Sequence, residues 1–192
     1  KIVTTGEGGM LVTNNPELHQ LARQLANQGE DPHRHYWFPM VGYNYRMTNI
    51  QAAIGLAQLE RVEWHMQRRR EVAELYRELL DPSGKVVVPW EPQGAHSVFW
   101  MSCALVRPGA GITRDALMAG LDEQGVETRP YFPPMHQLPI YSADNQRSFP
   151  VAEGLSQRGL NLPSSALLDE SDVRTVCSRL LALLDRATSR LA

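Results

Sequence analysis

The sequence predicts an α/β chain that ends in a small α+β domain. Three observations predict this class. Residues 8–29 carry the signals of a glycine turn, a strand and a capped helix; residues 48–80 hold the longest helical pattern; and strand and helix signals alternate after a turn at 81–84. Such elements pack in layers around one core. We place residues 1–80 in a first part and residues 81–192 in a second part.

The first part begins with a predicted turn, strand and helix. Residues 8–13, Gly-Gly-Met-Leu-Val-Thr, are typical of a glycine turn that leads into a short strand. A helix is predicted to follow, because Asn15 can cap it, Pro16 suits its first position and Gly29 can end it. Residues 30–47 are rich in aromatic residues, histidine, proline and glycine, which predicts a loop.

The long helical pattern begins at Thr48 and continues to about Leu80. An unbroken helix of about 33 residues would be roughly 50 Å long. We therefore expect a break or bend near residues 63–66.

The second part alternates between strand and helix patterns. Residues 81–84, Asp-Pro-Ser-Gly, predict a turn. The patterns that follow predict strands over 85–88, 97–106 and 126–129, helices over 113–124, 149–158 and 171–184, and a short extended link over 160–162.

Composition and charge exclude several classes of function. The net charge is −2 and the pI is about 6.3, which does not favour nucleic acid or an anionic membrane as a partner. No stretch approaches the roughly 20 apolar residues of a membrane span. Cys103 and Cys177 lie far apart in apolar runs, so a reduced, cytoplasmic protein is expected, although a disulfide is not excluded.

One basic run stands out, Arg68-Arg69-Arg70. Glutamates flank it at helical spacings, namely Glu60, Glu63, Glu71 and Glu74. We interpret the run as a solvated helix face and not as a phosphate-binding patch.

The chemistry-bearing residues gather in two places. Lys1 precedes a Thr-Thr-Gly-Glu-Gly-Gly turn, and glycines let a backbone approach a ligand closely. The loop at 30–47 holds polar side chains that can bind phosphate or sugar: His33, Arg34, His35, Tyr43, Asn44, Tyr45 and Arg46. A polar surface loop with packed aromatic residues is an equal alternative. We reject a metal site at His33 and His35, because no further ligand follows at a suitable spacing.

Four blocks of sequence resemble one enzyme family. Residues 1–10 (KIVTTGEGGM), 42–59 (GYNYRM and QAAIGLAQL within it), 129–136 (RPYFPPMH) and 160–163 (LNLP) are similar, in this order, to the DegT/DnrJ/EryC1/StrS family of nucleotide-sugar aminotransferases. The resemblance implies the C-terminal part of a fold-type-I, aspartate-aminotransferase-like enzyme. The first part would then be the end of the large cofactor-binding domain, and the second the small domain.

The resemblance also implies a cofactor and an assembly. Lys1 matches the lysine that forms a Schiff base with pyridoxal 5′-phosphate (PLP) and carries protons in the reaction. Asn44 matches an asparagine that reaches the PLP phosphate of the neighbouring subunit, which implies a homodimer with shared active sites. From position alone, Lys1 could be a frayed terminal residue and Asn44 a turn-stabilising residue.

Further residues are substrate-binding candidates by the same resemblance. Arg34, His35 and Tyr43 are candidates for sugar or diphosphate contacts. Arg46 could equally form a structural ion pair. Tyr131 and His136, with Arg129, fall in the block that faces the substrate in relatives, although a single histidine is usually structural or exposed. We interpret Glu7 as shaping the turn after Lys1.

Two segments, 36–42 and 96–101, look most similar to the GDP-perosamine synthase subgroup. That likeness implies transfer of an amino group from glutamate to C4 of GDP-4-keto-6-deoxymannose, in O-antigen biosynthesis. An aminotransferase for a dTDP- or UDP-linked keto sugar, and a non-catalytic homologue or interaction module, are the alternatives. Related sugar 3-dehydratases carry histidine in place of the lysine, and Lys1 argues against that activity.

Several family features are expected upstream of this sequence. They are the aspartate that pairs with the pyridine nitrogen, the aromatic residue that stacks on the ring, and the Ser/Thr residues of the phosphate cup. Because the first residue is Lys1 and not methionine, we expect a preceding half of the enzyme.

Overall fold

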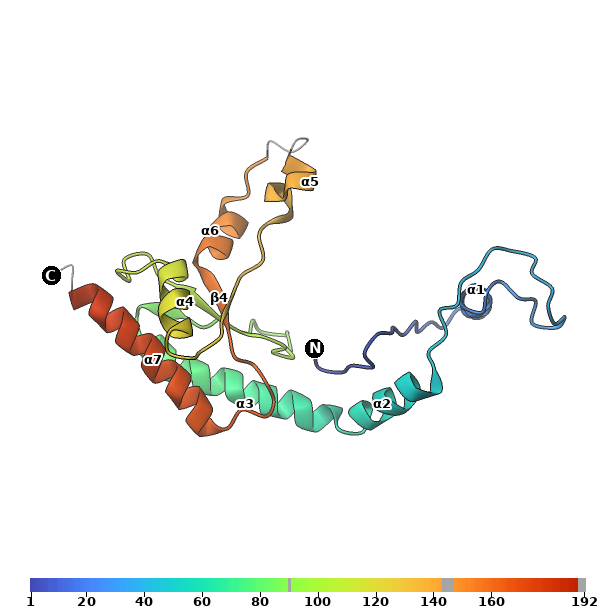
Figure 1. The fold of residues 1–192 in the computed structure, drawn as a ribbon, viewed down its shortest axis with the longest axis horizontal. Helices are drawn as coiled ribbons and strands as arrows, with labels where there is room; N and C mark the ends of the chain where they lie inside the picture. Colours follow the sequence, from blue (N-terminus) through green and yellow to red (C-terminus); the bar gives the residue numbers. More distant parts are fainter. Residues whose placement is uncertain (90, 143–146, 190–192) are drawn as a thin grey trace. The chain divides into compact units, whose positions relative to one another are not determined.

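The computed structural model describes residues 1–89, 91–142 and 147–189, and it divides into two compact units (Figure 1). The first unit comprises residues 1–62 and the second residues 63–192. The helix expected at the end of the first part, α3 (Val62–Leu80), therefore packs with the second unit. The division into domains at residues 80 and 81 stays a prediction.

The first unit has two helices joined by irregular chain. Helix α1 (Pro16–Ala26) begins where predicted, since the Asn15 side chain accepts hydrogen bonds from Glu17 N and Leu18 N at 2.9 and 3.1 Å. Helix α2 (Asn49–Leu59) begins with a capping box between Thr48 and Gln51. The predicted break comes at residues 60–61, slightly earlier than expected, and α3 follows at Val62.

The strand predicted after Gly8-Gly9 does not form. Residues 8–13 are irregular and exposed apart from Thr13, which is half-buried. The physical reason is that an extended segment becomes a strand only through a hydrogen-bonded neighbour, and none of the described residues pairs with this one.

The second unit is built on a four-stranded antiparallel sheet with the order β1-β2-β4-β3. Its strands are β1 (Val86–Val87), β2 (Ser102–Val106), β3 (Arg129–Pro130) and β4 (Gly159–Leu162). Three of them lie in or next to the predicted strand segments. The prediction was wrong for β4. Residues 159–162 form a central strand that pairs with both β2 and β3, whereas a short extended link was expected there.

The helices of the second unit follow the predicted pattern with some changes of length. They are α3, α4 (Arg114–Asp122), α6 (Pro150–Arg158) and α7 (Glu170–Ser189). Gly125 follows α4 with a φ of 75°, as expected of a helix stop. Two short elements were not predicted, a 3-10 turn η2 (Met135–Gln137) and α5 (Pro139–Ser142). A further 3-10 turn, η1 (Asp81–Ser83), occupies the predicted turn.

One hydrophobic core holds the second unit together. The alternation of buried and half-buried residues along β2 shows that one face of the sheet is covered. The core residues come from α3, α4, α7 and the sheet, among them Tyr76, Leu80, Leu117, Leu160 and Leu180, all with 0% exposure.

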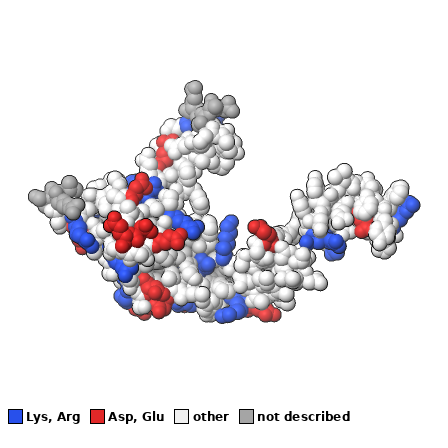
Figure 2. Space-filling model, in the orientation of Figure 1, with Lys and Arg blue, Asp and Glu red and all other residues white. Residues whose placement is uncertain are grey.

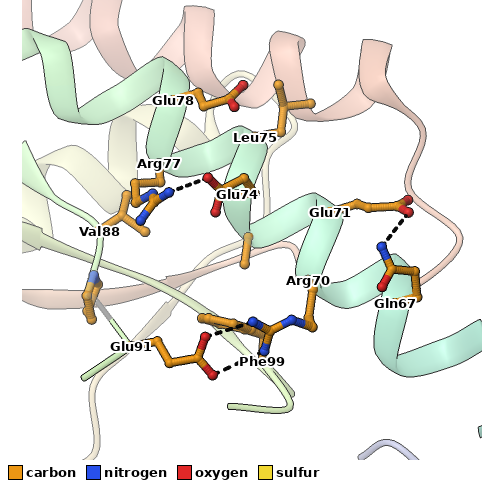
Figure 3. A pocket seen from close by; sticks show the side chains of 12 residues that line it. Gln67, Arg70, Glu71, Glu74, Leu75, Arg77, Glu78, Val88, Glu91 and Phe99 are labelled. Carbon is orange, nitrogen blue, oxygen red and sulfur yellow. Dashed lines mark hydrogen bonds and ion pairs between the residues drawn. The ribbon is translucent and has the colours of Figure 1, made fainter. Parts of the chain in front are cut away.

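The three arginines of α3 donate hydrogen bonds to carbonyl groups of the second unit. The prediction that they form a solvated helix face was therefore wrong. Arg68 donates to Leu168 O at 2.8 Å, and Arg69 donates to Ser164 O at 2.8 Å and Trp100 O at 3.0 Å. Arg70 lies against Glu91 and Phe99 beside a cavity of about 480 Å³ (Figure 3). Its guanidinium donates to Glu91 at 2.7 and 3.2 Å and to Ser97 O at 2.7 Å.

The surface carries mixed charge. Figure 2 shows Lys and Arg interspersed with Asp and Glu over the face in view. Among the described residues, no helix is both long and apolar enough to cross a bilayer.

Candidate functional site

Lys1 lies at a cavity formed within the first unit. Residues 1–10 run beside α2, where Gln51 Nε2 donates to Glu7 O at 3.0 Å, and Thr5 Oγ1 donates to the same oxygen at 2.8 Å. The cavity measures about 680 Å³. Its lining residues are Lys1, Val3, Thr4, Thr5, Gly6, Glu7, Gly8, Gly9, Met10, Met47, Ala52, Gly55, Leu56 and Leu59.

Two glycines allow this close packing. A Cβ at Gly55 would lie 2.9 Å from Thr5 Cγ2, and a Cβ at Gly8 would lie 2.8 Å from Thr5 Oγ1. The missing side chain at Gly55 lets Thr5 lie against α2, and the missing side chain at Gly8 leaves room for the Thr5 hydroxyl within residues 1–10. This explains in physical terms the glycine and small residues that the sequence places here.

Lys1 supplies the single amine of this cavity. The sequence contains two lysines, Lys1 and Lys85. Lys85 lies in the second unit, where its Nζ donates to Asp185 at 2.7 Å and Thr188 Oγ1 at 3.0 Å. Its ammonium is therefore committed to the end of α7. A cofactor that must form an imine with a lysine finds the suitable group at Lys1, in a cavity with mostly apolar walls.

The two ends of the predicted loop are joined by backbone hydrogen bonds at the end of α1. Tyr43 N donates to Leu25 O at 2.7 Å, Gln28 N to Tyr43 O at 2.9 Å, and Tyr45 N to Ala26 O at 3.0 Å. These bonds fasten the backbone on both sides of Asn44 to the end of α1, and Asn44 forms a β-bridge with Asn27. The Asn44 side chain is left exposed.

Gly29 and Gly42 bring the two sides of the loop into backbone contact. A Cβ at Gly29 would lie 2.1 Å from Met40 O, and a Cβ at Gly42 would lie 2.1 Å from Gly29 N. Gly29 also has a φ of 79°, which suits glycine. No other residue fits at either position without a shift of the backbone.

Two carboxylates, which the sequence analysis did not single out, organise the end of the loop. Glu30 accepts hydrogen bonds from Tyr36 N at 2.8 Å and Asn27 Nδ2 at 3.1 Å. These bonds, the Tyr36 amide first, lower the pKa of Glu30, and His35 lies 3.8 Å away. Asp31 accepts from His33 N at 2.8 Å and Arg34 N at 3.1 Å. The sequence signal was an acidic pair directly after the glycine that ends a helix.

The candidate binding residues of the loop are exposed. The Arg34 guanidinium lies 4.1 Å from the centre of the Trp37 ring, and the rings of Tyr43 and Tyr45 stack at 5.0 Å. His35 is 95% exposed. The charge of Arg46 contributes to the lowered pKa of Glu30, and an ion-pair role for Arg46 stays a prediction.

In the second unit, Tyr131 is held by its neighbours. Its N–H donates to Gly159 O at 3.0 Å, and its hydroxyl is hydrogen-bonded to the Cys103 thiol. Burial first, and this thiol second, raise the pKa of Tyr131. Cys103 donates in turn to Asn161 Oδ1 at 3.2 Å. Cys103 and Cys177 are both free thiols.

His136 is likewise engaged, and Arg129 is exposed. His136 Nε2 lies 2.9 Å from Glu153 Oε1, and its ring packs against Phe149 at 4.8 Å. Glu153 also accepts from Phe149 N at 2.7 Å, so the histidine is tied to the start of α6. Arg129 forms a 3.1 Å ion pair with Glu127, and both side chains are nearly four-fifths exposed. Such a pair contributes little stability.

The structure divides the candidates between the two units, and of the candidates in the first unit Lys1 alone lines the cavity beside α2. Lys1, Arg34, His35, Tyr43 and Asn44 belong to the first unit, whereas Tyr131 and His136 belong to the second. Within residues 1–89, 91–142 and 147–189, no three His, Cys, Asp or Glu side chains are placed to hold a metal ion.

Comparison with known proteins finds one family across the chain. The sequence profile of the DegT/DnrJ/EryC1/StrS aminotransferase family matches residues 1–181. The chain is 46% identical over 187 residues to a GDP-perosamine synthase of Caulobacter vibrioides, covering 97% of this chain and 49% of that protein. It is 42% identical over 177 residues to a GDP-perosamine synthase of Escherichia coli, covering 92% and 47%.

A solved structure has the same fold. The aminotransferase TlmJ from Streptoalloteichus hindustanus superposes with a TM-score of 0.86 at 33% identity, covering 98% of this chain and 50% of that one. The chain thus spans about half the length of the proteins that it matches.

Proposed function

The chain belongs to the DegT/DnrJ/EryC1/StrS aminotransferase family, and from that membership we propose that it is the C-terminal part of a PLP-dependent sugar aminotransferase. The proposed reaction transfers an amino group from glutamate to a GDP-linked 4-keto-6-deoxy sugar and yields GDP-perosamine. The observation that carries the proposal is Lys1, which lines a cavity beside the glycine-rich turn and matches the lysine of the family motif. The likeness to two GDP-perosamine synthases supports the sugar and the nucleotide.

The residues at the Lys1 cavity fit PLP. They offer a primary amine, mostly apolar walls and a backbone that the glycines leave open. When bound, PLP supplies an electron sink and carries the amino group between the two substrates. The chain supplies the group that anchors it and moves protons.

Lys1 would act through its Nζ in both half-reactions. In its neutral form, Nζ can take a proton from the carbon that bears the amino group in glutamate. In the second half-reaction it can deliver a proton to the sugar carbon that receives the amino group.

Asn44 would hold the cofactor phosphate in a homodimer. Its exposed amide can donate a hydrogen bond to a phosphate oxygen, and the fastened backbone on either side fixes its direction. By the family resemblance, that phosphate belongs to the neighbouring subunit. We therefore propose a homodimer in which each site is shared.

The remaining candidates would bind the nucleotide sugar. Arg34, His35 and Tyr43 lie exposed on one rigid loop, as binding groups must. Tyr131 and His136 are half-buried and hydrogen-bonded within the second unit. In a substrate role, they would contact the sugar through the part of each ring that is still exposed. A role in O-antigen biosynthesis and a cytoplasmic location are part of the same proposal.

The test is an absorbance spectrum of the purified full-length enzyme, including the expected preceding half, with PLP, before and after borohydride, for wild type and Lys1→Ala. We expect a band near the visible edge that borohydride fixes to Lys1, that glutamate shifts, and that Lys1→Ala lacks. Lys85→Arg is the matched control and should keep the band, because it preserves the ion pair with Asp185. An unchanged band in Lys1→Ala, or no band in wild type, would contradict the proposal.

The sugar acceptor is tested next. GDP-linked and dTDP-linked 4-keto-6-deoxy sugars are compared as acceptors under the same conditions. Preference for the dTDP-linked sugar would assign the chain to an aminotransferase of another nucleotide.

A further inference from the structure

The guanidinium of Arg34 is supported by an aromatic ring but forms no hydrogen bond with the described residues. It lies over an aromatic residue, with its central carbon 4.1 Å from the Trp37 ring centre. Arg34 forms hydrogen bonds through its backbone, since its N–H donates to Asp31 and its carbonyl accepts from Trp37 N, whereas its guanidinium forms none with the described residues. An arginine stacked on an indole keeps its N–H fork directed outward in the plane of the guanidinium.

The loop that carries Arg34 is rigid enough to aim this fork. Asp31 N donates to Trp37 O at 2.8 Å, so the chain returns on itself between these residues. Asp31 also fixes the Arg34 amide, and Glu30 fixes the Tyr36 amide. Carboxylates therefore hold the backbone at Arg34 and at Tyr36, the residue before Trp37.

The charge around Arg34 disfavours a phosphate as its ligand. Residues 30–37 contain two carboxylates, Glu30 and Asp31, and one arginine, with His33 and His35 nearby. The formal charge of this segment, with the histidines counted as neutral, is −1, and Arg46, whose charge acts on Glu30, brings the local sum to about zero. A diphosphate would be repelled by both carboxylates, whereas an uncharged ligand with two adjacent acceptors would not.

A guanine base matches this chemistry. Its O6 and N7 are two acceptors at the spacing of an arginine fork, and adenine presents a donor in place of O6. Tyr36 is 88% exposed, so its ring is open for stacking with a flat base, and Trp37, with Arg34 over its ring, is still 50% exposed. A phosphate would leave these rings unused.

We propose that Arg34 reads the O6/N7 edge of the guanine in a GDP-linked substrate, while the aromatic residues beside it stack with the base. This inference rests on the proposed function for the nature of the substrate. It narrows the role of Arg34 from a general sugar or diphosphate contact to the residue that selects the nucleotide.

The experiment measures Kd for GDP, IDP and ADP by calorimetry with the purified protein. The variants are Arg34→Ala, Arg34→Lys and, as a matched control, Arg23→Ala, which removes an exposed arginine of α1 outside the loop. Wild type should bind GDP and IDP more tightly than ADP by roughly 5- to 150-fold, the range for one bidentate contact. Arg34→Ala and Arg34→Lys should abolish this ratio, because lysine lacks the fork, and Arg23→Ala should keep it.

Two results would overturn the inference. One is an equal loss of affinity for all three nucleotides in Arg34→Ala, which would show a phosphate contact. The other is a wild type without preference for GDP over ADP. The assay needs neither PLP nor glutamate, so failure of transamination in the borohydride experiment and failure of guanine recognition here are separate results.

Discussion

Gly159 shows how one residue without a side chain decides the place of another. Its φ is −87°, which every residue type adopts, so its importance is not conformational. A Cβ at this position would lie 2.3 to 2.6 Å from three atoms of the Tyr131 ring. The ring of a candidate substrate residue thus lies directly on the backbone of the central strand.

Replacing this glycine should displace the ring. Gly159→Ala is expected to lower the free energy of unfolding by about 1–3 kcal/mol, the usual cost of overfilling a packed site, and to weaken the bond between Tyr131 and Cys103. The measurement is chemical denaturation of wild type, Gly159→Ala, Tyr131→Ala and the double variant. The double variant should recover most of the loss caused by Gly159→Ala. Additive effects of the two substitutions would refute the steric explanation.

Residue identity predicted the candidates of the site but not their partners. Lys1, Arg34 and Asn44 could be named from sequence because the blocks in which or beside which they lie resemble the family, and because lysine, arginine and amide groups suit the chemistry that it implies. Glu30 and Trp37 were not named, although Glu30 fixes the loop and Trp37 supports the Arg34 guanidinium. Their roles arise from the closure of the loop, which no single residue reveals.

At the scale of elements, α3 serves as an anchor for the loops of the second unit. Its three consecutive arginines contact two loops, the one between β4 and α7 through Ser164 and Leu168, and the one between β1 and β2 through Ser97 and Trp100. The expectation of a solvated face was wrong because helical spacing identifies neighbours along the helix but not the loops that return to it. Arg70 and Glu91 form the best connected of these contacts (Figure 3).

This ion pair predicts a dependence of stability on pH. The Arg70 guanidinium, followed by the Ser97 amide, lowers the pKa of Glu91 from 4.5 to about 2. A carboxyl whose pKa is lower in the folded protein stabilises it fully above the unfolded value, and the contribution disappears as the pH falls toward the folded value. Glu91→Gln should therefore lower Tm at pH 7, and the difference from wild type should shrink between about pH 4.5 and pH 2.

Thermal unfolding followed by circular dichroism at pH 7, 4.5 and 3 measures this difference. Glu74→Gln is the control, because Glu74 pairs with Arg77 but is 53% exposed. Exposed pairs contribute about 0–1 kcal/mol, so its Tm should change little at any pH. A difference for Glu91→Gln that stays constant down to pH 3 would rule out titration of Glu91 as the cause.

Elements with strong local signals were predicted well, and elements defined by their neighbours were not. Capping residues and glycine stops placed α1, α2 and α4 close to their observed bounds. Strand β4 was taken for a link because Leu160-Asn161-Leu162 is short, and its place between β2 and β3 depends on pairing. The strand expected at 8–13 failed for the same reason, since it has no partner among the described residues.

At the scale of the whole molecule, burial is distributed very unevenly. The described core residues all belong to the second unit. In the first unit, the described residues that are fully buried are Gly29 and Gly55. Many large apolar residues of the first unit are exposed, among them Met10, Val12, Tyr36, Val41 and Ile50, each at least 75%.

This distribution predicts different stabilities for the two units. Residues 63–192 expressed alone should fold and unfold cooperatively, because they contain a complete core, whereas residues 1–62 alone should show no cooperative transition. Thermal unfolding of each fragment by circular dichroism is the measurement. Within the larger fragment, Leu117→Ala should cost roughly 2–5 kcal/mol. A broad, uncooperative transition of residues 63–192 would show that its core is insufficient.

The sequence by itself determined the family, the order of most elements and the residue types of the candidate site. It could do so because caps, glycine stops, hydrophobic periodicity and motif blocks are local, and each is legible in a few consecutive residues. Only the tertiary structure decided that residues 159–162 form a central strand, that Arg68, Arg69 and Arg70 anchor loops, that Glu30 binds the Tyr36 amide and that Trp37 lies against the Arg34 guanidinium. These features depend on groups far apart in the chain, whose contacts exist only once folding has offset the entropy of bringing them together.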